Sequence, residues 1–348
     1  MRTLRRVLEA SPSLEVRVAA AARIVLIVAQ GTEAGEVFGR KADAVLHYDG
    51  GVLLDDSGRE FTEQAAKSFA DEGVCIIRHL QARAITKKLR QCGIFAVMDL
   101  THLDWRDAKL LDVRLIHDHL DKIEQVFARL DAQSAEILLY IILFRITADP
   151  DILKFSDYPQ YIHKNLPFSE HEIIIDGGAF IGDSAVLFYN ETQGRARIFS
   201  FEPDIDNYNT LFRNILHNNV SDRIHAIPYG IWDSRTTLFF NSMSQSSRIV
   251  ESGDNFIKTM DIDWFCSFLH INPTWIKLDV EGAEMRALRG ARDAIRSNKP
   301  KLCISLYHRA EDLWELPAFI LSLRDDYVFH IGHHSPDLTI YETVLYAY

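Results

Sequence analysis

Short apolar runs, separated by segments of helix length, form two groups along the chain. The first group has runs at 23–31, 43–51, 73–80 and 94–100, a spacing typical of a parallel α/β sheet. From about 106 to 168, apolar residues recur at steps of three and four, which predicts helices. We therefore expect a smaller, Rossmann-like α/β domain over 1–105, followed by a helical connector over 106–170.

The second group begins at residue 172 and predicts one larger sheet. Its parallel-type runs lie at 172–176, 196–203, 223–231, 275–280 and 301–308. Two more runs, 327–334 and 342–348, flank a short polar loop and are expected to pair as an antiparallel hairpin. The order predicts a doubly wound α/β sheet with a terminal antiparallel hairpin, in a domain over 171–348.

Acidic and glycine residues gather where these strands end. Ligands of doubly wound sheets bind outside the carboxyl ends of the strands. The residues that the second group places there are Asp176 with Gly177, Gly178 and Gly182, then Glu202, Asp279 and His308. Glycine lets a backbone approach a ligand closely because no Cβ intervenes. An acid ending the second strand can accept hydrogen bonds from both hydroxyls of a ribose.

The charge at this edge favours one kind of ligand. Asp176 stands where the phosphates of a dinucleotide would approach, so a cationic ligand with an amine, such as S-adenosylmethionine (SAM), fits better than NAD. The whole chain has a formal net charge of −11, which argues against binding to a nucleic-acid backbone.

Four segments carry a resemblance to a known family. "IIIDGGAFIGDS", "FSFEPDIDNYNTLFRN", "WIKLDVEGAEMRALRGA" and "ISLYHRAEDLWELP" resemble the FkbM-type SAM-dependent methyltransferases. The resemblance covers roughly 172–348, and "KLDVEGAE" is its most specific motif. It implies a class I methyltransferase fold and methylation of hydroxyl oxygens on sugars, glycans and related natural products. "AEILLYIILFRITADP" and "DYPQYI" also resemble the helical lead-in of members that have an extra N-terminal α/β domain.

The resemblance also implies roles for single residues. Asp176, Gly178 and Gly182 would line the methionine half of SAM, and Glu202 would hold the ribose. Asp279 would face the methionine amine or the site of methyl transfer.

His308 is the candidate general base for the acceptor hydroxyl. It lies at the tip of the fifth strand, and a histidine with a pKa near neutrality suits proton removal. Tyr307 and His308 should point to opposite sides of the strand, so only one would enter the cleft. The polar "RAED" that follows should keep His308 hydrated. Asp279 or water are the alternatives for this proton.

No metal and no membrane segment are expected. Asp279 and Glu281 stand two apart, and the sequence shows no third oxygen ligand beside them. The four cysteines have no C-x-x-C spacing, so we expect no zinc cluster and a reduced, cytoplasmic location. The longest apolar stretch, 18–29, is interrupted by Arg23 and is too short to span a bilayer.

The N-terminal segment imitates a dinucleotide fingerprint. Gly31 and Gly35 follow its first strand and Asp49 ends the next, but the glycine spacing does not match G-x-G-x-x-G. We expect this domain to position substrate or to form a homo-oligomer. Two alternatives to a methyltransferase remain: a SAM-binding protein without catalysis, and a nucleotide-sugar or NAD-dependent enzyme that uses the N-terminal domain.

Overall fold

The chain divides into two compact units. The computed structural model describes residues 17, 21, 23–29, 36–37, 40–49, 52–55, 58–62, 73–79, 81–101, 113–241, 248–250, 255–334 and 341–348. The first unit falls within residues 1–124, 132–155 and 333–342, and the second within 125–131, 156–332 and 343–348.

The first unit contains the predicted N-terminal sheet. Its strands, in the order β5–β4–β1–β6–β7, are β5 (Val52–Asp55), β4 (Ala44–Asp49), β1 (Arg23–Ala29), β6 (Gly73–Arg78) and β7 (Val97–Asp99). The pairs β1–β4, β1–β6 and β6–β7 are parallel, as predicted. The edge strand β5 was not predicted and runs antiparallel to β4. Only residues 50 and 51 separate the two strands, and a connection this short joins antiparallel partners. A two-residue pair, β2 (Glu36–Val37) and β3 (Arg40–Lys41), forms a separate ribbon.

Helix α4 (Ala82–Gln91) connects β6 to β7 within the first sheet. The helices predicted after that sheet are α5 (Val113–Asp118), α6 (Leu120–Phe127) and α7 (Ala132–Thr147), and a 3₁₀ turn, η3 (Pro150–Ile152), follows them. Asp149 is extended and caps η3, which confirms that the long helix ends before Asp149-Pro150. Arg90 on α4 pairs with Asp149 at 2.6 Å and with Asp151, so η3 is tied to α4. No helix among the described residues is long and apolar enough to cross a membrane.

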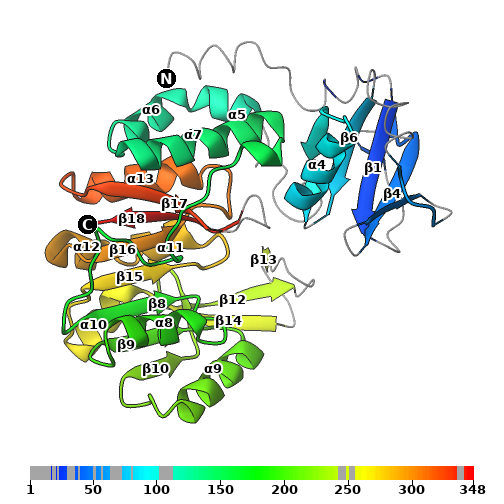
Figure 1. The fold of residues 1–348 in the computed structure, drawn as a ribbon. Helices are drawn as coiled ribbons and strands as arrows, with labels where there is room; N and C mark the ends of the chain where they lie inside the picture. The colour runs from blue at the N-terminus through cyan, green and yellow to red at the C-terminus, as the bar shows by residue number, and fades with distance from the viewer. Residues whose placement is uncertain are drawn as a thin grey trace. The chain divides into compact units, whose positions relative to one another are not determined.

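The second unit contains the predicted seven-stranded sheet (Figure 1). Its strands, in spatial order, are β10 (Ile224–Ile227), β9 (Arg197–Phe201), β8 (Ile173–Gly177), β15 (Trp275–Leu278), β16 (Lys301–Ser305), β18 (Thr343–Ala347) and β17 (Phe329–His333). The first five are parallel, and β18 runs antiparallel to β16. The backbones of Val328 and Tyr348 exchange hydrogen bonds of 2.9 and 3.2 Å, which confirms the terminal antiparallel hairpin.

Helices alternate with these strands, as a doubly wound fold requires. They are α8 (Asp183–Glu191), α9 (Ile205–His217), α10 (Ile262–Leu269), α11 (Glu284–Arg289), α12 (Arg292–Asn298) and α13 (Asp312–Leu323). Residues 284–298 form two helices rather than one, because the helical backbone of α11 ends at Arg289. A Cβ on Gly290 would lie 2.1 Å from the Trp232 carbonyl oxygen, so the backbone packs too closely there for any other residue.

A smaller sheet accompanies the large one. It has the order β11 (Gly230–Ile231), β14 (Asn255–Met260), β12 (Thr236–Asn241) and β13 (Arg248–Val250). The hairpin-like pattern at 236–241 predicted β12, but β14 was missed because Lys258 interrupts its short apolar run.

Candidate cofactor and active site

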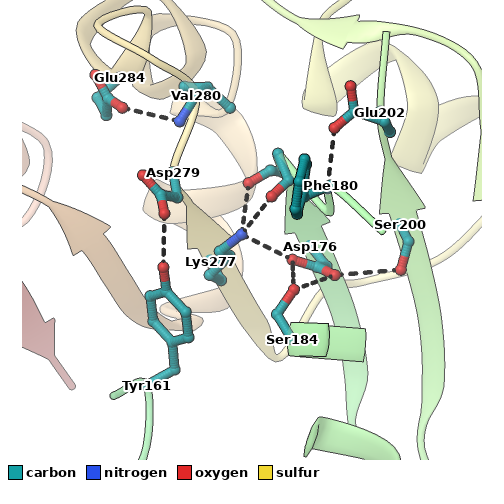
Figure 2. Close-up of polar contacts among 12 residues, drawn as sticks. Tyr161, Asp176, Phe180, Ser184, Ser200, Glu202, Lys277, Asp279, Val280 and Glu284 are labelled. Carbon is teal, nitrogen blue, oxygen red and sulfur yellow. Dashed lines mark hydrogen bonds and ion pairs between the residues drawn. The ribbon is translucent and has the colours of Figure 1, made fainter. Parts of the chain in front are cut away.

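Three neighbouring strands carry a row of polar side chains through the middle of the large sheet. Ser200 on β9, Asp176 on β8 and Lys277 on β15 lie opposite one another in register. The fully buried Asp176 carboxylate lies 3.2 Å from the Lys277 ammonium nitrogen and accepts hydrogen bonds from the Ser184 and Ser200 hydroxyls (Figure 2). Such partners are needed, because breaking a buried ion pair costs about 3–5 kcal/mol.

Lys277 also holds the glycine turn that follows β8. Its ammonium donates hydrogen bonds to the carbonyl oxygens of Gly177 at 3.1 Å and of Gly178 at 2.7 Å (Figure 2). Burial lowers the pKa of Lys277, but the carboxylates of Asp176 and Asp279 raise that pKa above its usual value overall. Lys277 is therefore charged at neutral pH although its side chain is only 2% exposed.

The glycines of this turn make room for the protein itself. A Cβ on Gly178 would lie 1.8 Å from the Asp279 carbonyl oxygen, and one on Gly177 would lie 2.8 Å from the Ile231 side chain. Gly182, with a φ of +99°, would clash at 2.7 Å with a leucine side chain. The backbone is thus closely approached at all three glycines, as expected. The atoms that approach it belong to the protein, namely the Asp279 carbonyl after β15 and apolar side chains, and not to a ligand.

Asp176 lies inside this network. The sequence analysis expected its carboxylate to face a cationic ligand, whereas the structure directs it toward Lys277 and two serines. Its charge is therefore balanced within the sheet.

Glu202 caps the turn from the tip of β9. Its Oε2 accepts the backbone N–H of Phe180 at 2.9 Å (Figure 2). Its Oε1 accepts the backbone N–H of Asp204 at 2.9 Å. Burial raises the pKa of Glu202 to about 7, although these two N–H groups lower it in part. Each carboxylate oxygen has a second lone pair, and the Asn207 side chain also hydrogen-bonds this carboxyl, so two ligand hydroxyls would bind Glu202 in place of Asn207.

Asp279 is held in place by two tyrosines at the tip of β15. Its Oδ2 accepts the Tyr161 hydroxyl at 2.7 Å and its Oδ1 accepts the Tyr307 hydroxyl at 2.9 Å. Burial raises the pKa of Asp279, but the positive charges of His308 and Lys277, together with the two hydroxyls, lower it below its usual value overall. Asp279 is therefore a fixed anion, and its side chain is 19% exposed.

His308 lies among carboxylates. Its Nδ1 is 2.8 Å from Glu284 Oε1, and its Nε2 is 3.5 Å from both Asp279 Oδ1 and Glu281 Oε2. Burial lowers the pKa of His308, but Glu284, Glu281 and Asp279 raise it well above its usual value overall. The resting state is thus an imidazolium whose Nδ1–H faces Glu284.

Three expectations about His308 are wrong. Its side chain is 1% exposed, so it is not hydrated, and its pKa is not near neutrality. Tyr307 and His308 do not point to opposite sides either, since both approach Asp279 Oδ1. The reason is that β16 ends at Ser305, so the alternation of a strand no longer applies at these residues.

Asp279, Glu284 and His308 bring three potential metal-ligand atoms within 4.8 Å of one another. A third ligand was not expected because Glu284 lies further along the chain, at the start of α11, and His308 follows a different strand, β16. Asp312 is buried beside them, and burial together with the charge of Glu284 raises the pKa of its carboxyl to about 8.

Several residues of this network were not predicted as site residues: Tyr161, Ser184, Ser200, Lys277 and Glu284. The sequence carried a signal for Lys277, since it is the one charge within the buried run "WIKL". Tyr161 lies in the lead-in segment "DYPQYI", but nothing in the sequence indicates that its hydroxyl reaches Asp279 across 118 positions.

The N-terminal fingerprint cannot be compared with the structure in full. Gly31 and Gly35 lie outside the described residues, whereas Asp49 ends β4 as expected. The role of this unit in positioning substrate or in oligomerisation stays a prediction.

The sequence of the second unit matches a known family. Residues 176–331 match the family described as "Methyltransferase FkbM domain". A crystal structure of methyltransferase FkbM from Methylobacillus flagellatus superimposes with a TM-score of 0.71 and 25% identity, over 99% of this chain and 97% of that one. These matches confirm the predicted family and fold class.

Two curated relatives are also methyltransferases. Hexuronic acid methyltransferase AglP of Haloferax volcanii is 26% identical over 133 residues, which is 37% of this chain and 53% of AglP. Methyltransferase 1 of Beauveria bassiana is 26% identical over 224 residues, which is 52% of this chain and 87% of that protein. The chain therefore spans about half the length of AglP and most of Methyltransferase 1.

Proposed function

From the FkbM methyltransferase domain that residues 176–331 form, we propose that this protein transfers a methyl group from SAM to a hydroxyl of a sugar, glycan or related natural product. The observation that carries the proposal is the placement of two carboxyl groups on either side of the turn after β8 (Figure 2). Glu202 lies at the tip of β9 and Asp279 at the tip of β15, and each is held by hydrogen bonds.

The residues at this edge fit SAM in chemistry. The second lone pairs of the Glu202 carboxylate suit the two ribose hydroxyls, and the anion Asp279 suits the methionine ammonium. Phe180, whose backbone N–H donates to Glu202, and Ile205, which follows Glu202 at the start of α9, are 52% and 61% exposed, so they offer apolar surface for the adenosine. SAM bound here would supply an electrophilic methyl group on a sulfonium.

His308 is our proposed acceptor of the hydroxyl proton. Glu284 holds the proton on Nδ1, so Nε2 is the nitrogen that can take a proton from the acceptor once it is deprotonated. SAM is a cation, and a cation held at this edge of the sheet would lower the pKa of His308, because a positive charge disfavours the imidazolium.

A sugar or glycan acceptor is supported by one relative. AglP acts on a hexuronic acid by its name, and its match covers 37% of this chain. Turnover measured against a panel of sugars, uronic acids and polyketide-type hydroxyls tests the acceptor class. Calorimetry with SAM, NAD and UDP-sugars tests the cofactor, and binding of NAD in place of SAM would reject the proposal.

Replacing Glu202 with alanine should weaken SAM binding about ten- to a hundredfold, because two hydrogen bonds to a charged group are lost. Calorimetry on the folded variant measures the affinity. As a control, Asp206→Ala removes an exposed carboxylate from the first turn of α9, close to Glu202 in the sequence, and should leave SAM affinity unchanged. Unaltered affinity in Glu202→Ala would show that the ribose does not bind there.

Methyl transfer should proceed without a metal. Both oxygens of Asp279 accept tyrosine hydroxyls, and Glu284 Oε1 accepts the Val280 N–H at 2.9 Å. The imidazolium of His308 supplies the positive charge that a cation would bring. EDTA treatment should therefore leave the rate within about twofold. A loss of activity that magnesium or manganese restores would contradict this.

A further inference from the structure

We propose that Lys277 is a positioning residue for the cofactor: by holding the carbonyls of Gly177 and Gly178, it fixes the turn that separates Glu202 from Asp279. This inference rests on the proposed SAM site. It assigns a role to a residue of the sheet interior that does not itself touch the cofactor.

The hydrogen bonds of Lys277 are fully used inside the protein. Its ammonium has three N–H groups and three oxygen partners: Gly178 at 2.7 Å, Gly177 at 3.1 Å and Asp176 at 3.2 Å. The ring of Tyr161 lies 5.2 Å from the same nitrogen. Since the side chain is only 2% exposed, no proton is left to meet a ligand.

The turn is held on both sides. Lys277 binds its carbonyls from β15, while the N–H groups of Gly178 and Ala179 both donate to the Phe201 carbonyl of β9 at 3.0 Å. The next N–H, that of Phe180, donates to Glu202. One hydrogen-bonded path therefore runs from Glu202 through the turn to Lys277 on β15 (Figure 2).

Lys277 and Asp279 are two residues apart on the same chain segment. The Asp279 N–H donates to the Gly177 carbonyl at 3.1 Å, and this carbonyl also accepts from Lys277. Movement of the turn would thus shift both proposed contacts of SAM, the ribose at Glu202 and the ammonium at Asp279. A displacement on the order of 1 Å near the reacting groups can cost about a hundredfold in rate.

A purely structural alternative must be separated from this role. Lys277 also neutralises Asp176, so Lys277→Met alone leaves a buried, unpaired carboxylate and should destabilise the fold. The pair Asp176→Asn/Lys277→Met removes both charges and should regain most of the lost stability. It still lacks the donor to the two glycine carbonyls.

The experiment compares stability and SAM affinity across four proteins: wild type, Asp176→Asn, Lys277→Met and the Asp176→Asn/Lys277→Met pair. We expect the pair to unfold near the wild-type denaturant midpoint but to bind SAM at least about tenfold more weakly. Asp176→Asn/Lys277→Gln retains an amide donor and should bind more tightly than the methionine pair. If Asp176→Asn/Lys277→Met binds SAM as tightly as the wild type does, Lys277 serves only to neutralise Asp176, and the inference is overturned.

Hydrogen exchange on the wild type gives a test that does not depend on variants folding. The amide protons of Gly178 and Ala179 should be protected before SAM is added, because the turn is already fixed. If they exchange freely and become protected only with SAM, the cofactor orders the turn and the inference fails. Absence of SAM binding by the wild type would instead reject the proposed function.

Discussion

Replacing His308 with asparagine should lower the rate of methyl transfer by about 10²–10⁴-fold while SAM still binds. Asparagine fits the buried site but cannot take the acceptor proton. Single-turnover measurements with saturating SAM separate the chemical step from binding. His217→Asn changes an exposed histidine at the end of α9 and should leave the rate unchanged.

The pH profile adds a signature that a structural histidine would lack. The pKa of His308 is raised well above its usual value by its carboxylate neighbours, so the basic form increases as pH rises above neutrality. The wild-type rate should therefore climb on the alkaline side until this pKa, as shifted by SAM, is passed. The asparagine variant should lose that rise. Near-wild-type rates in both His308→Asn and His308→Ala between about pH 6 and pH 9 would show that another group takes the proton.

Gly178→Ala should be among the most destabilising single changes in the second unit, with a loss of unfolding free energy of about 4 kcal/mol or more. The backbone has a φ of +73°, and the new Cβ would lie 1.8 Å from the Asp279 carbonyl oxygen, so β8 and β15 would have to separate. Denaturant unfolding measures the loss, and calorimetry should show that SAM binding is lost in any protein that still folds.

Gly282→Ala is the matched control for this clash. Gly282 also has a positive φ, +94°, but its Cβ would meet nothing closer than Arg309 Nε at 3.4 Å. Only the backbone penalty of about 1–2 kcal/mol applies there. Equal losses in the two variants would mean that the close approach to Asp279 carries no cost of its own.

The presence of the strands was predictable where burial leaves a mark in the sequence. Parallel strands that are buried on both faces read as nearly continuous apolar runs, and β8, β9, β15 and β16 do so, with only isolated polar residues. The edge strand β5 and the small-sheet strand β14 have no such mark.

The sequence identified which residues lie at the strand tips, but it did not show which side chains surround them. Acids at strand tips identified Glu202 and Asp279, because carboxyl ends of parallel strands meet at one edge. The sequence also shows Asp176 and Lys277 as lone charges in apolar strands. It does not show that β8 and β15, far apart in the chain, are neighbours with these two residues in register.

The environment of His308 was the largest failure of sequence reasoning. Its pKa depends on Glu284 at the start of α11 and on Asp279 at the tip of β15, and both are brought to it by packing. The polar residues after His308 suggested solvent, whereas the following loop and helix bury it. Local polarity does not indicate exposure where a helix returns over a strand end.

Tyr161 determines where a functional fragment of the second unit must begin. Its hydroxyl reaches Asp279, its backbone N–H binds the Tyr346 hydroxyl at 3.1 Å, and Phe168 stacks on Trp275 at 4.2 Å. A fragment that began near residue 171, just before β8, would carry the four segments from 173 onward that resemble the family and still lack one of the two hydroxyls that fix Asp279. The smallest portable module of the second unit therefore begins before β8, within the lead-in segment that contains Tyr161.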